Sequence, residues 1–146
     1  MMGEGRNLVN PSDSKSVTSL ILAGVGGQGT ILVSKILTQG LLAAGFDVKM
    51  SEVHGMSQRG GSVSTQVRFG TKVDSPIIGA GGADILVAFE KLEAARYAKY
   101  LRPGGLAIVN MHEILPVPVS SGLETYPEGI MEALERHFKV IRIDAA

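Results

Sequence analysis

The chain has 146 residues, of which 45% are hydrophobic and 19% are charged, and its 14 basic residues balance 14 acidic ones. A chain of this length forms one domain around a single hydrophobic core. The zero net charge excludes the long-range attraction that nucleic-acid binding needs, and it favours association with another protein. Because the sequence contains no cysteine, disulfides, thiolate nucleophiles and iron–sulfur clusters held by this chain are excluded.

The N-terminal stretch MMGEGRNLVNPSDSKS is polar and rich in turn-forming residues. We expect residues 1–16 to form a disordered tail and residues 17–146 to form the folded domain. The tail lacks the apolar core of a signal peptide, and no apolar stretch approaches the ~18 residues of a membrane span. We therefore expect a cytoplasmic protein that contacts no membrane. The three histidines lie far apart without the spacing of metal ligands, which argues against a metal site.

A strand, a helix and a second strand are predicted at the start of the domain. Residues 17–23 (VTSLILA) are apolar and partly β-branched, as in a buried strand. The run GVGGQG separates this strand from residues 30–45, where apolar residues recur at helical spacing until Gly45. Residues 46–50 predict the second strand. Such a βαβ unit gathers ligands at the carboxyl ends of its strands.

The next part of the chain has a different pattern. Residues 51–61 are polar and contain several glycines, which predicts a loop. Residues 62–69 alternate apolar and polar side chains, so we expect a strand that is antiparallel to its neighbours or at an edge of the sheet. After a second glycine-rich loop, residues 83–89 predict a buried strand and residues 90–101 a helix that Pro103 ends.

Two strands and one helix complete the predicted domain. Residues 106–110 and 140–144 are the strands, residues 111–126 form a proline-containing loop, and residues 127–137 form a helix that begins with proline. This order predicts an α/β fold: a three-layer α/β/α Rossmann-like domain with a mostly parallel, mixed sheet. No covering helix follows the last strand before Ala146. We expect either that a partner covers this face of the sheet or that the natural chain continues.

Gly24, Gly26 and Gly29 fit the fingerprint G-x-G-x-x-G between the first strand and the first helix. Glycine permits positive φ and a close approach of phosphate, while the helix N-terminus stabilises an anion by about 0.3–1 kcal/mol. Thr30 can add a hydroxyl donor. NAD or FAD binding would also use an acidic residue about twenty positions later, a place that Glu52 fills beyond the end of the second strand. Dinucleotide binding and a plain strand–helix turn both stay open.

The segment Ser51–Gly70 (SEVHGMSQRGGSVSTQVRFG) carries most of the polar chemistry. If the first two strands are parallel, this segment lies beside the GVGGQG turn. The two segments would then form a polar pocket with a fixed positive charge, suited to phosphate or carboxylate. Its groups are a carboxylate, an imidazole, an amide, a guanidinium and three glycines: Glu52, His54, Gln58, Arg59, Gly55, Gly60 and Gly61.

Five segments resemble, in the same order, the gamma domain of 2-oxoacid:ferredoxin oxidoreductases, and the likeness is strongest to the indolepyruvate-oxidising type. The segments are GVGGQGT, SEVHGMSQRGGSV, SPII, ADILVAFEKLEAARY and YLRPGGLAIVN. The likeness extends from about Val17 to the C-terminus. GVGGQG alone is a weak signal, whereas its ordered combination with EVHGMSQRGG is specific.

The resemblance implies a subunit of an enzyme that oxidatively decarboxylates a 2-oxoacid, transfers the acyl group to coenzyme A and passes electrons to ferredoxin. In the indolepyruvate type, a large alpha subunit carries thiamine diphosphate, Mg²⁺ and the 4Fe–4S clusters. The likeness therefore implies a hetero-oligomer in which this chain binds none of these cofactors alone and meets ferredoxin only indirectly. Family members also extend beyond Ala146 with helical sequence.

The resemblance assigns two segments to coenzyme A or to the partner interface, and it assigns no catalytic residue to this chain. The candidate binding residues are Gly24, Val25, Gly26, Gly27, Gln28, Gly29 and Thr30 in the first segment, and Glu52, His54, Gly55, Gln58, Arg59, Gly60 and Gly61 in the second.

Simpler interpretations of single residues stay open. His54 either moves a proton or only hydrogen-bonds its own loop, and Arg59 either binds an anion or pairs with Glu52. Glu90 and Glu93 begin a helix, where carboxylates complement the helix dipole. An independent NAD- or FAD-binding oxidoreductase and a scaffold domain without a ligand are the alternative functions.

Overall fold

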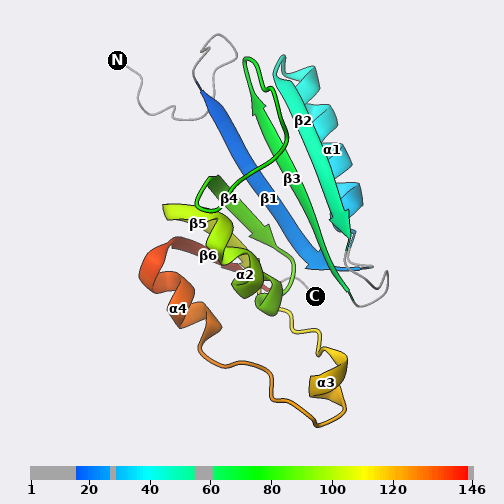
Figure 1. Ribbon diagram of the computed structural model, residues 1–146, viewed down its shortest axis with the longest axis vertical. Helices are drawn as coiled ribbons and strands as arrows, with labels where there is room; N and C mark the ends of the chain where they lie inside the picture. Colours follow the sequence, from blue (N-terminus) through cyan, green and yellow to red (C-terminus); the bar gives the residue numbers. More distant parts are fainter. Residues whose placement is uncertain (1–15, 27–28, 55–60, 145–146) are drawn as a thin grey trace.

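A computed structural model describes residues 16–26, 29–54 and 61–144 of the chain. The predicted tail therefore lies outside the described residues, apart from Ser16. The strands, in chain order, are β1 (Val17–Val25), β2 (Asp47–His54), β3 (Ser62–Gly70), β4 (Ala83–Ala88), β5 (Leu101–Asn110) and β6 (Lys139–Ile143). They form one sheet with the order β2-β3-β1-β4-β5-β6 (Figure 1).

The sheet is mixed because one strand runs against the others. β1, β4, β5 and β6 pair in parallel, whereas β3 is antiparallel to both β1 and β2. The predicted direction of β3 is thus correct. However, β3 lies inside the sheet, and β2 takes the edge. The predicted α/β fold with a mostly parallel, mixed sheet is confirmed.

The helices form a layer on each face of the sheet. They are α1 (Thr30–Ala43), α2 (Lys91–Tyr97), the 3₁₀ turn η1 (Ala98–Tyr100), α3 (Val117–Ser120) and α4 (Ile130–His137). α1 packs on β1, β2 and β3, while α2 and α4 pack together against the other face. α3 is a single turn in a long excursion away from the sheet (Figure 1).

The middle of the sheet is buried on both faces, which explains the unbroken apolar run of β1. Ile21 and Ala23 lie in the cluster that contains residues of α2 and α4. Leu20 and Leu22 lie in the other cluster, against Leu37 of α1. Successive side chains of a strand point to opposite faces, so a strand between two helical layers needs apolar residues at consecutive positions.

Several predicted boundaries are wrong at one end. β2 continues to His54, so the beginning of the predicted polar loop belongs to the strand. β5 begins at Leu101, and the register between β4 and β5 shifts between Ala83 and Ile85, so the residues around Pro103 bulge from a strand. α2 is shorter than predicted, and its last turn is 3₁₀. α4 begins three residues after Pro127, at Ile130.

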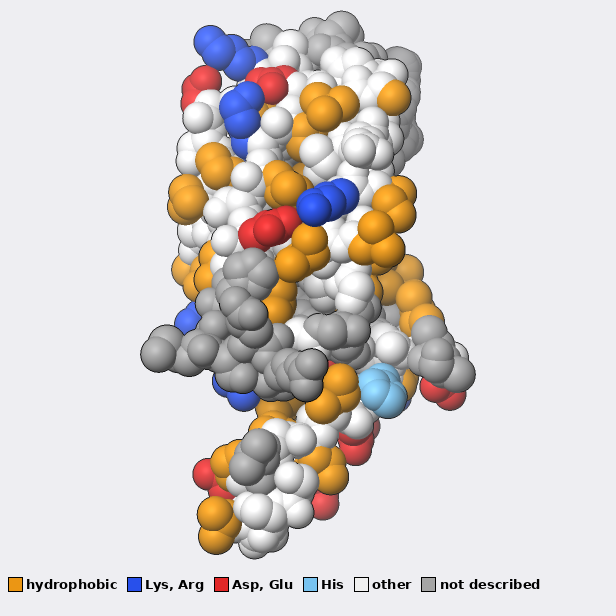
Figure 2. Space-filling model, turned by 90° about the vertical axis from the view of Figure 1, so that its right-hand side faces the viewer, with side chains coloured by type: hydrophobic (Ala, Val, Ile, Leu, Met, Phe, Trp, Pro, Cys, Tyr) orange, Lys and Arg blue, Asp and Glu red, His pale blue; other side chains and the backbone are white. Residues whose placement is uncertain are grey.

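One part of the sheet remains without a helix on the side of α1. Ile141 and Ile143 of β6 are 49% and 43% exposed, and Ile141 pairs with the partly buried Ile108 of β5. On α1, which packs over β1, β2 and β3, Leu32 and Ile36 are 63% and 60% exposed. Figure 2 views the side that carries α1 and β2, where hydrophobic side chains form several patches among scattered charged groups.

Candidate functional site

The candidate residues meet at one end of the sheet. β1 and β2 both finish there, and α1 and β3 begin there (Figure 1). Gly24 of β1 and His54 of β2 are both paired with Val63, on opposite sides of β3. Since neighbouring strands lie ~4.8 Å apart, these two backbones are about 10 Å apart. The sequence correctly placed the two segments at one end, but it did not predict the strand between them.

The glycine turn leads into an uncapped helix. The Gly26 amide donates to the Gly61 carbonyl oxygen at 2.9 Å, which ties the turn to the start of β3. Gly29 is the N-cap residue of α1, with φ of 82°. This left-handed conformation favours glycine. Among the described residues no side chain caps α1, and its first turn contains no acidic residue, so its N-terminal amides suit an anion.

Thr30 begins the helix and is only 3% exposed. Its hydroxyl makes no hydrogen bond to the described part of the protein. A buried hydroxyl without a partner is destabilising by about 1–3 kcal/mol, so the position favours a group that can bond to it. Thr30 is therefore the described candidate residue with the clearest open hydrogen-bonding capacity.

Glu52 is on β2 and is half-buried. Val48 and Met50 of the same strand pack toward α1, and strand alternation places Glu52 on that face as well. His54 ends the strand, opposite Val63. The remaining predicted residues of both segments lie outside the described ranges: Gly27, Gln28, Gly55, Gln58, Arg59 and Gly60.

A buried polar cluster that the sequence did not reveal lies on the opposite face of the sheet. Glu93 of α2 is 4% exposed, and it accepts hydrogen bonds from the Ser62 hydroxyl and from Arg96 Nε, the latter at 3.0 Å. The Tyr97 hydroxyl lies 3.2 Å from the Ser62 hydroxyl. Glu93 and Arg96 have the spacing of an ordinary pair on a helix surface. The sequence therefore does not show that this carboxylate is buried, because its partner Ser62 lies 31 positions earlier in the chain.

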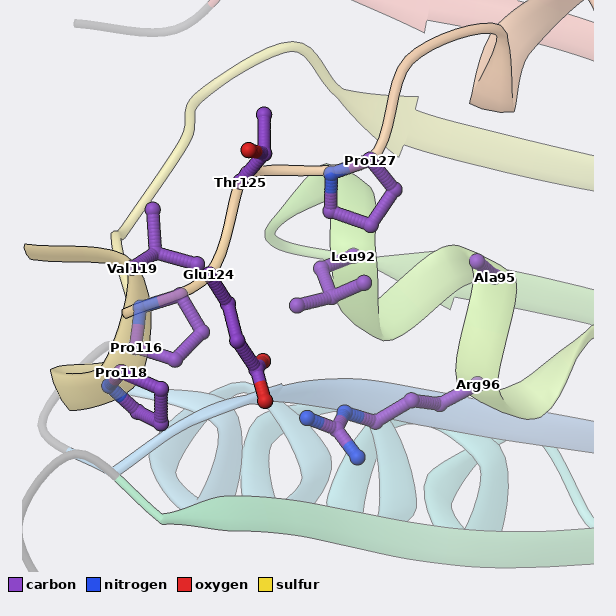
Figure 3. A pocket seen from close by; sticks show the side chains of 9 residues that line it. All are labelled: Leu92, Ala95, Arg96, Pro116, Pro118, Val119, Glu124, Thr125 and Pro127. Atoms are coloured by element: carbon purple, nitrogen blue, oxygen red, sulfur yellow. The ribbon is translucent and has the colours of Figure 1, made fainter. Parts of the chain in front are cut away.

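Two cavities adjoin this cluster and share Arg96 as a wall. The smaller, about 390 Å³, is lined by Ser62, Arg96, Tyr97, Lys99 and Tyr100. The larger, about 520 Å³, lies between α2 and the 116–127 segment, with Leu92 and prolines in its wall. In Figure 3, Arg96 and Glu124 extend toward each other across the larger cavity.

A second buried carboxylate fixes the wall of the larger cavity. Glu90 is the N-cap residue of α2, and it accepts hydrogen bonds from the Glu93 and Ile114 amides, each at 3.0 Å, and from the Tyr126 hydroxyl. The Tyr126 hydroxyl in turn accepts a hydrogen bond from the Leu92 amide at 3.0 Å. Glu90 stands at the start of a helix, where its carboxylate complements the helix dipole as predicted, but the side chain is buried.

The described residues include several groups that can bind an anion. Residues 16–26, 29–54 and 61–144 contain no cluster of three or more histidine, aspartate or glutamate residues that could hold a metal ion. Among the helices of these residues, none is long and apolar enough to cross a membrane. The glycine turn instead offers helix amides and a hydroxyl, and the cavity beside α2 offers cationic side chains; both kinds of group recognise anions.

Comparison with known families gives one match over most of the chain. The model described as "Pyruvate ferredoxin/flavodoxin oxidoreductase" matches residues 19–146. The chain is 45% identical over 131 residues to "Indolepyruvate oxidoreductase subunit IorB" of Pyrococcus horikoshii, covering 87% of this chain and 65% of that protein. The proteins of the same name from Thermococcus kodakarensis and Archaeoglobus fulgidus are 48% and 46% identical, each over 75% of this chain and 54% of the relative. The chain thus spans between about half and two thirds of these relatives.

Solved structures share the fold. The gamma subunit of keto/oxoacid ferredoxin oxidoreductase from Geobacter sulfurreducens matches with a TM-score of 0.59 and 19% identity, over 88% of this chain and 61% of that one. The 2-oxoglutarate:ferredoxin oxidoreductase from Magnetococcus marinus, solved with 2-oxoglutarate, coenzyme A and succinyl-CoA bound, also gives a TM-score of 0.59 at 19% identity. That match covers 89% of this chain and 20% of the larger one.

Proposed function

Because the chain belongs to the pyruvate ferredoxin/flavodoxin oxidoreductase family, we propose that it is a subunit of a 2-oxoacid:ferredoxin oxidoreductase. The observation that carries the proposal is the identity of 45–48% to three proteins named as indolepyruvate oxidoreductase subunits. Indolepyruvate or another aryl pyruvate is accordingly the proposed substrate. In the reaction, the 2-oxoacid loses carbon dioxide, its acyl group passes to the thiol of coenzyme A, and two electrons pass to ferredoxin.

In this proposal the redox chemistry belongs to another subunit. The chain contains no cysteine that could hold an iron–sulfur cluster. We assign thiamine diphosphate, Mg²⁺ and the clusters to a large partner subunit in the cytoplasm, and we derive no reaction step on this chain. The zero net charge supports a protein that works in an assembly.

The proposed task of this chain is to hold the acyl acceptor at the glycine turn. The uncapped N-terminus of α1 and the Thr30 hydroxyl offer donors to a phosphate of coenzyme A. Glu52 and His54 come from the neighbouring end of β2 and would form the opposite wall. The segments outside the described residues, with Arg59, complete this proposed site.

The first experiment is co-purification of the tagged chain from its native host. A large, brown, cysteine-rich, thiamine-binding subunit recovered in equal amount is the expected result, and 2-oxoacid assays of the complex follow directly. Recovery of the chain alone with bound NAD or FAD would overturn the subunit assignment. In that case the glycine turn is an ordinary dinucleotide site.

A pair of threonine variants tests the coenzyme A assignment in the reconstituted complex. Thr30→Val removes a hydroxyl at the glycine turn and should raise the KM for coenzyme A about three- to tenfold. Thr65→Val is the matched control, because Thr65 is also buried with a hydroxyl that has no partner in the described part of the chain, but it lies within β3. Equal effects of both variants would support a scaffold domain instead.

A further inference from the structure

The smaller cavity beside α2 is lined by cationic and phenolic side chains whose hydrogen-bond donors are not all occupied within the described residues. It is lined by Arg96, Lys99, Tyr97, Tyr100 and Ser62. These residues come from α2, η1 and the start of β3. The cavity lies on the face of the sheet opposite α1, so it is separate from the uncapped helix N-terminus at the glycine turn.

Arg96 is held by one edge of its guanidinium and leaves the other edge available. Its Nε donates to Glu93 at 3.0 Å, and that carboxylate is also fixed by the Ser62 hydroxyl. Within the described part of the protein, the Arg96 hydrogen bonds use only Nε. The two Nη groups keep their donors in the planar fork that matches the oxygens of carboxylate and phosphate.

Lys99 adds a second positive charge to the cavity, beside the ring of Tyr100. The Lys99 ammonium lies 5.5 Å from the centre of the Tyr100 ring, and the Tyr97 and Tyr100 rings stack with centroids 5.9 Å apart. The one acidic side chain of this cluster, Glu93, is buried and already accepts two hydrogen bonds. Among the described residues, two cations therefore line the cavity, and the carboxylate that pairs with Arg96 is buried beside Nε.

The distribution of acids determines on which side of Arg96 an anion can lie. Glu124 lines the larger cavity and extends toward Arg96 there (Figure 3). Its carboxylate would repel an anion in the larger cavity. The smaller cavity is not lined by Glu124. An anionic group is therefore favoured on the Lys99 side of Arg96.

We propose that the smaller cavity binds the anionic group, phosphate or carboxylate, of a small ligand through Arg96 and Lys99. Two charge-assisted contacts to Arg96 orient the anion, and Lys99 adds attraction without fixed geometry. This site does not depend on the proposed coenzyme A contact at the glycine turn, since the two share no described residue. The proposal can fail while the subunit assignment holds, and the reverse is also true.

The chain contains its own reporter for this site. It has no tryptophan and three tyrosines, and Tyr97 and Tyr100 line the cavity. Tyrosine fluorescence of the Tyr126→Phe protein therefore reports on these two residues alone. Titration with pyrophosphate, inorganic phosphate and acetate at low ionic strength should change this signal saturably. Phosphate probes alone, or carboxylate probes alone, would identify the source of the anion, and either outcome supports an anion site.

Three variants determine whether Arg96 and Lys99 cause the signal. Arg96→Gln should weaken binding by about tenfold or more, and Lys99→Gln by about two- to fivefold. Arg136→Gln is the matched control, an exposed helix arginine that lines neither cavity, and it should bind like the parent. Since Arg96→Gln removes a partner of the buried Glu93, circular dichroism must show that it is folded, and Lys99→Gln tests the site without that change. No saturable signal with any probe, or equal affinities of all variants, would overturn the proposal.

Discussion

The Glu90 carboxylate, which is 1% exposed, accepts a hydrogen bond from the hydroxyl of Tyr126, 36 positions later in the chain. The same carboxylate accepts hydrogen bonds from the first turn of α2 and from Ile114. One buried side chain thus joins the start of a helix to both ends of the excursion that contains α3. This excursion forms one wall of the larger cavity, so Glu90 keeps that cavity in shape.

Tyr126→Phe should destabilise the protein by about 1.5–3 kcal/mol, because it removes a hydrogen bond to a charged group and leaves the Leu92 amide without its acceptor. Urea unfolding followed by circular dichroism measures the change. Tyr100→Phe is the control, since no hydrogen bond of the Tyr100 hydroxyl occurs within the described residues, and it should change stability by less than about 0.5 kcal/mol. A similar loss in both variants would contradict the role given to Glu90.

The pKa of Tyr126 is raised far above its usual value of 10.0, first by burial and then by the hydrogen bond to Glu90. The folded state therefore holds this proton more tightly than the unfolded state. The contribution to stability is fully present below pH 10 and decreases as the pH rises above it. In an absorbance titration of the parent protein, the tyrosine signal that is missing from Tyr126→Phe should appear at a higher pH than the signal of a free tyrosine. Titration of that signal near pH 10 would be evidence against the buried hydrogen bond.

Asp47 connects the edge strand to the segment after β3. Its carboxylate accepts the Val73 amide at 2.8 Å and pairs with Lys49 at 2.9 Å, and these contacts lower the pKa of Asp47 below 3.8. The folded state thus favours the ionised form. The contribution of Asp47 to the free energy of unfolding is present above pH 4 and is lost as the pH falls through the lowered pKa. Asp47→Asn should have a lower urea midpoint than the parent at pH 7, and the difference should shrink toward pH 2.

Two glycines of the first βα unit should respond to alanine in opposite directions. A Cβ meets no atom within 4 Å at either Gly29 or Gly40, so only backbone conformation distinguishes the two sites. Gly29→Ala forces alanine to φ of 82° and should destabilise by about 1 kcal/mol. Gly40→Ala, inside α1, should stabilise by about 0.5–1 kcal/mol. Thermal unfolding of both variants checks the signs, and a gain at Gly29 would argue against the left-handed turn.

The elements of the fold could be predicted because each has a local pattern. The apolar run of β1 and the alternation of β3 are properties of a few neighbouring residues. The position of β3 between β1 and β2 depends on pairing across the chain, about which the alternation says nothing. The start of β5 at Leu101 was missed for a similar reason, because Pro103 and the glycines after it resemble a loop until the pairing with β4 is known.

The candidate site was predicted in part. The fingerprint glycines identified the turn, where the positive φ of Gly29 favours glycine. The buried carboxylates of Glu90 and Glu93 could not be found in the same way. Their partners Tyr126 and Ser62 lie 36 and 31 positions away, and a glutamate at a helix start looks the same in sequence whether it is buried or exposed.

The position of β3 also has a consequence for the order of folding. β1 and β2 do not pair with each other, because β3 lies between them. A nascent chain that has left the ribosome only as far as His54 therefore contains two strands and a helix but cannot form the native sheet. The native sheet hydrogen bonds of β2 can form only when Ser62–Gly70 emerges and inserts between the two strands. Before that moment the apolar residues of β1 and α1 have little to pack against, which is the interval in which chaperones bind growing chains. Ribosome-stalled chains of increasing length should therefore gain protease resistance only after Gly70 has emerged.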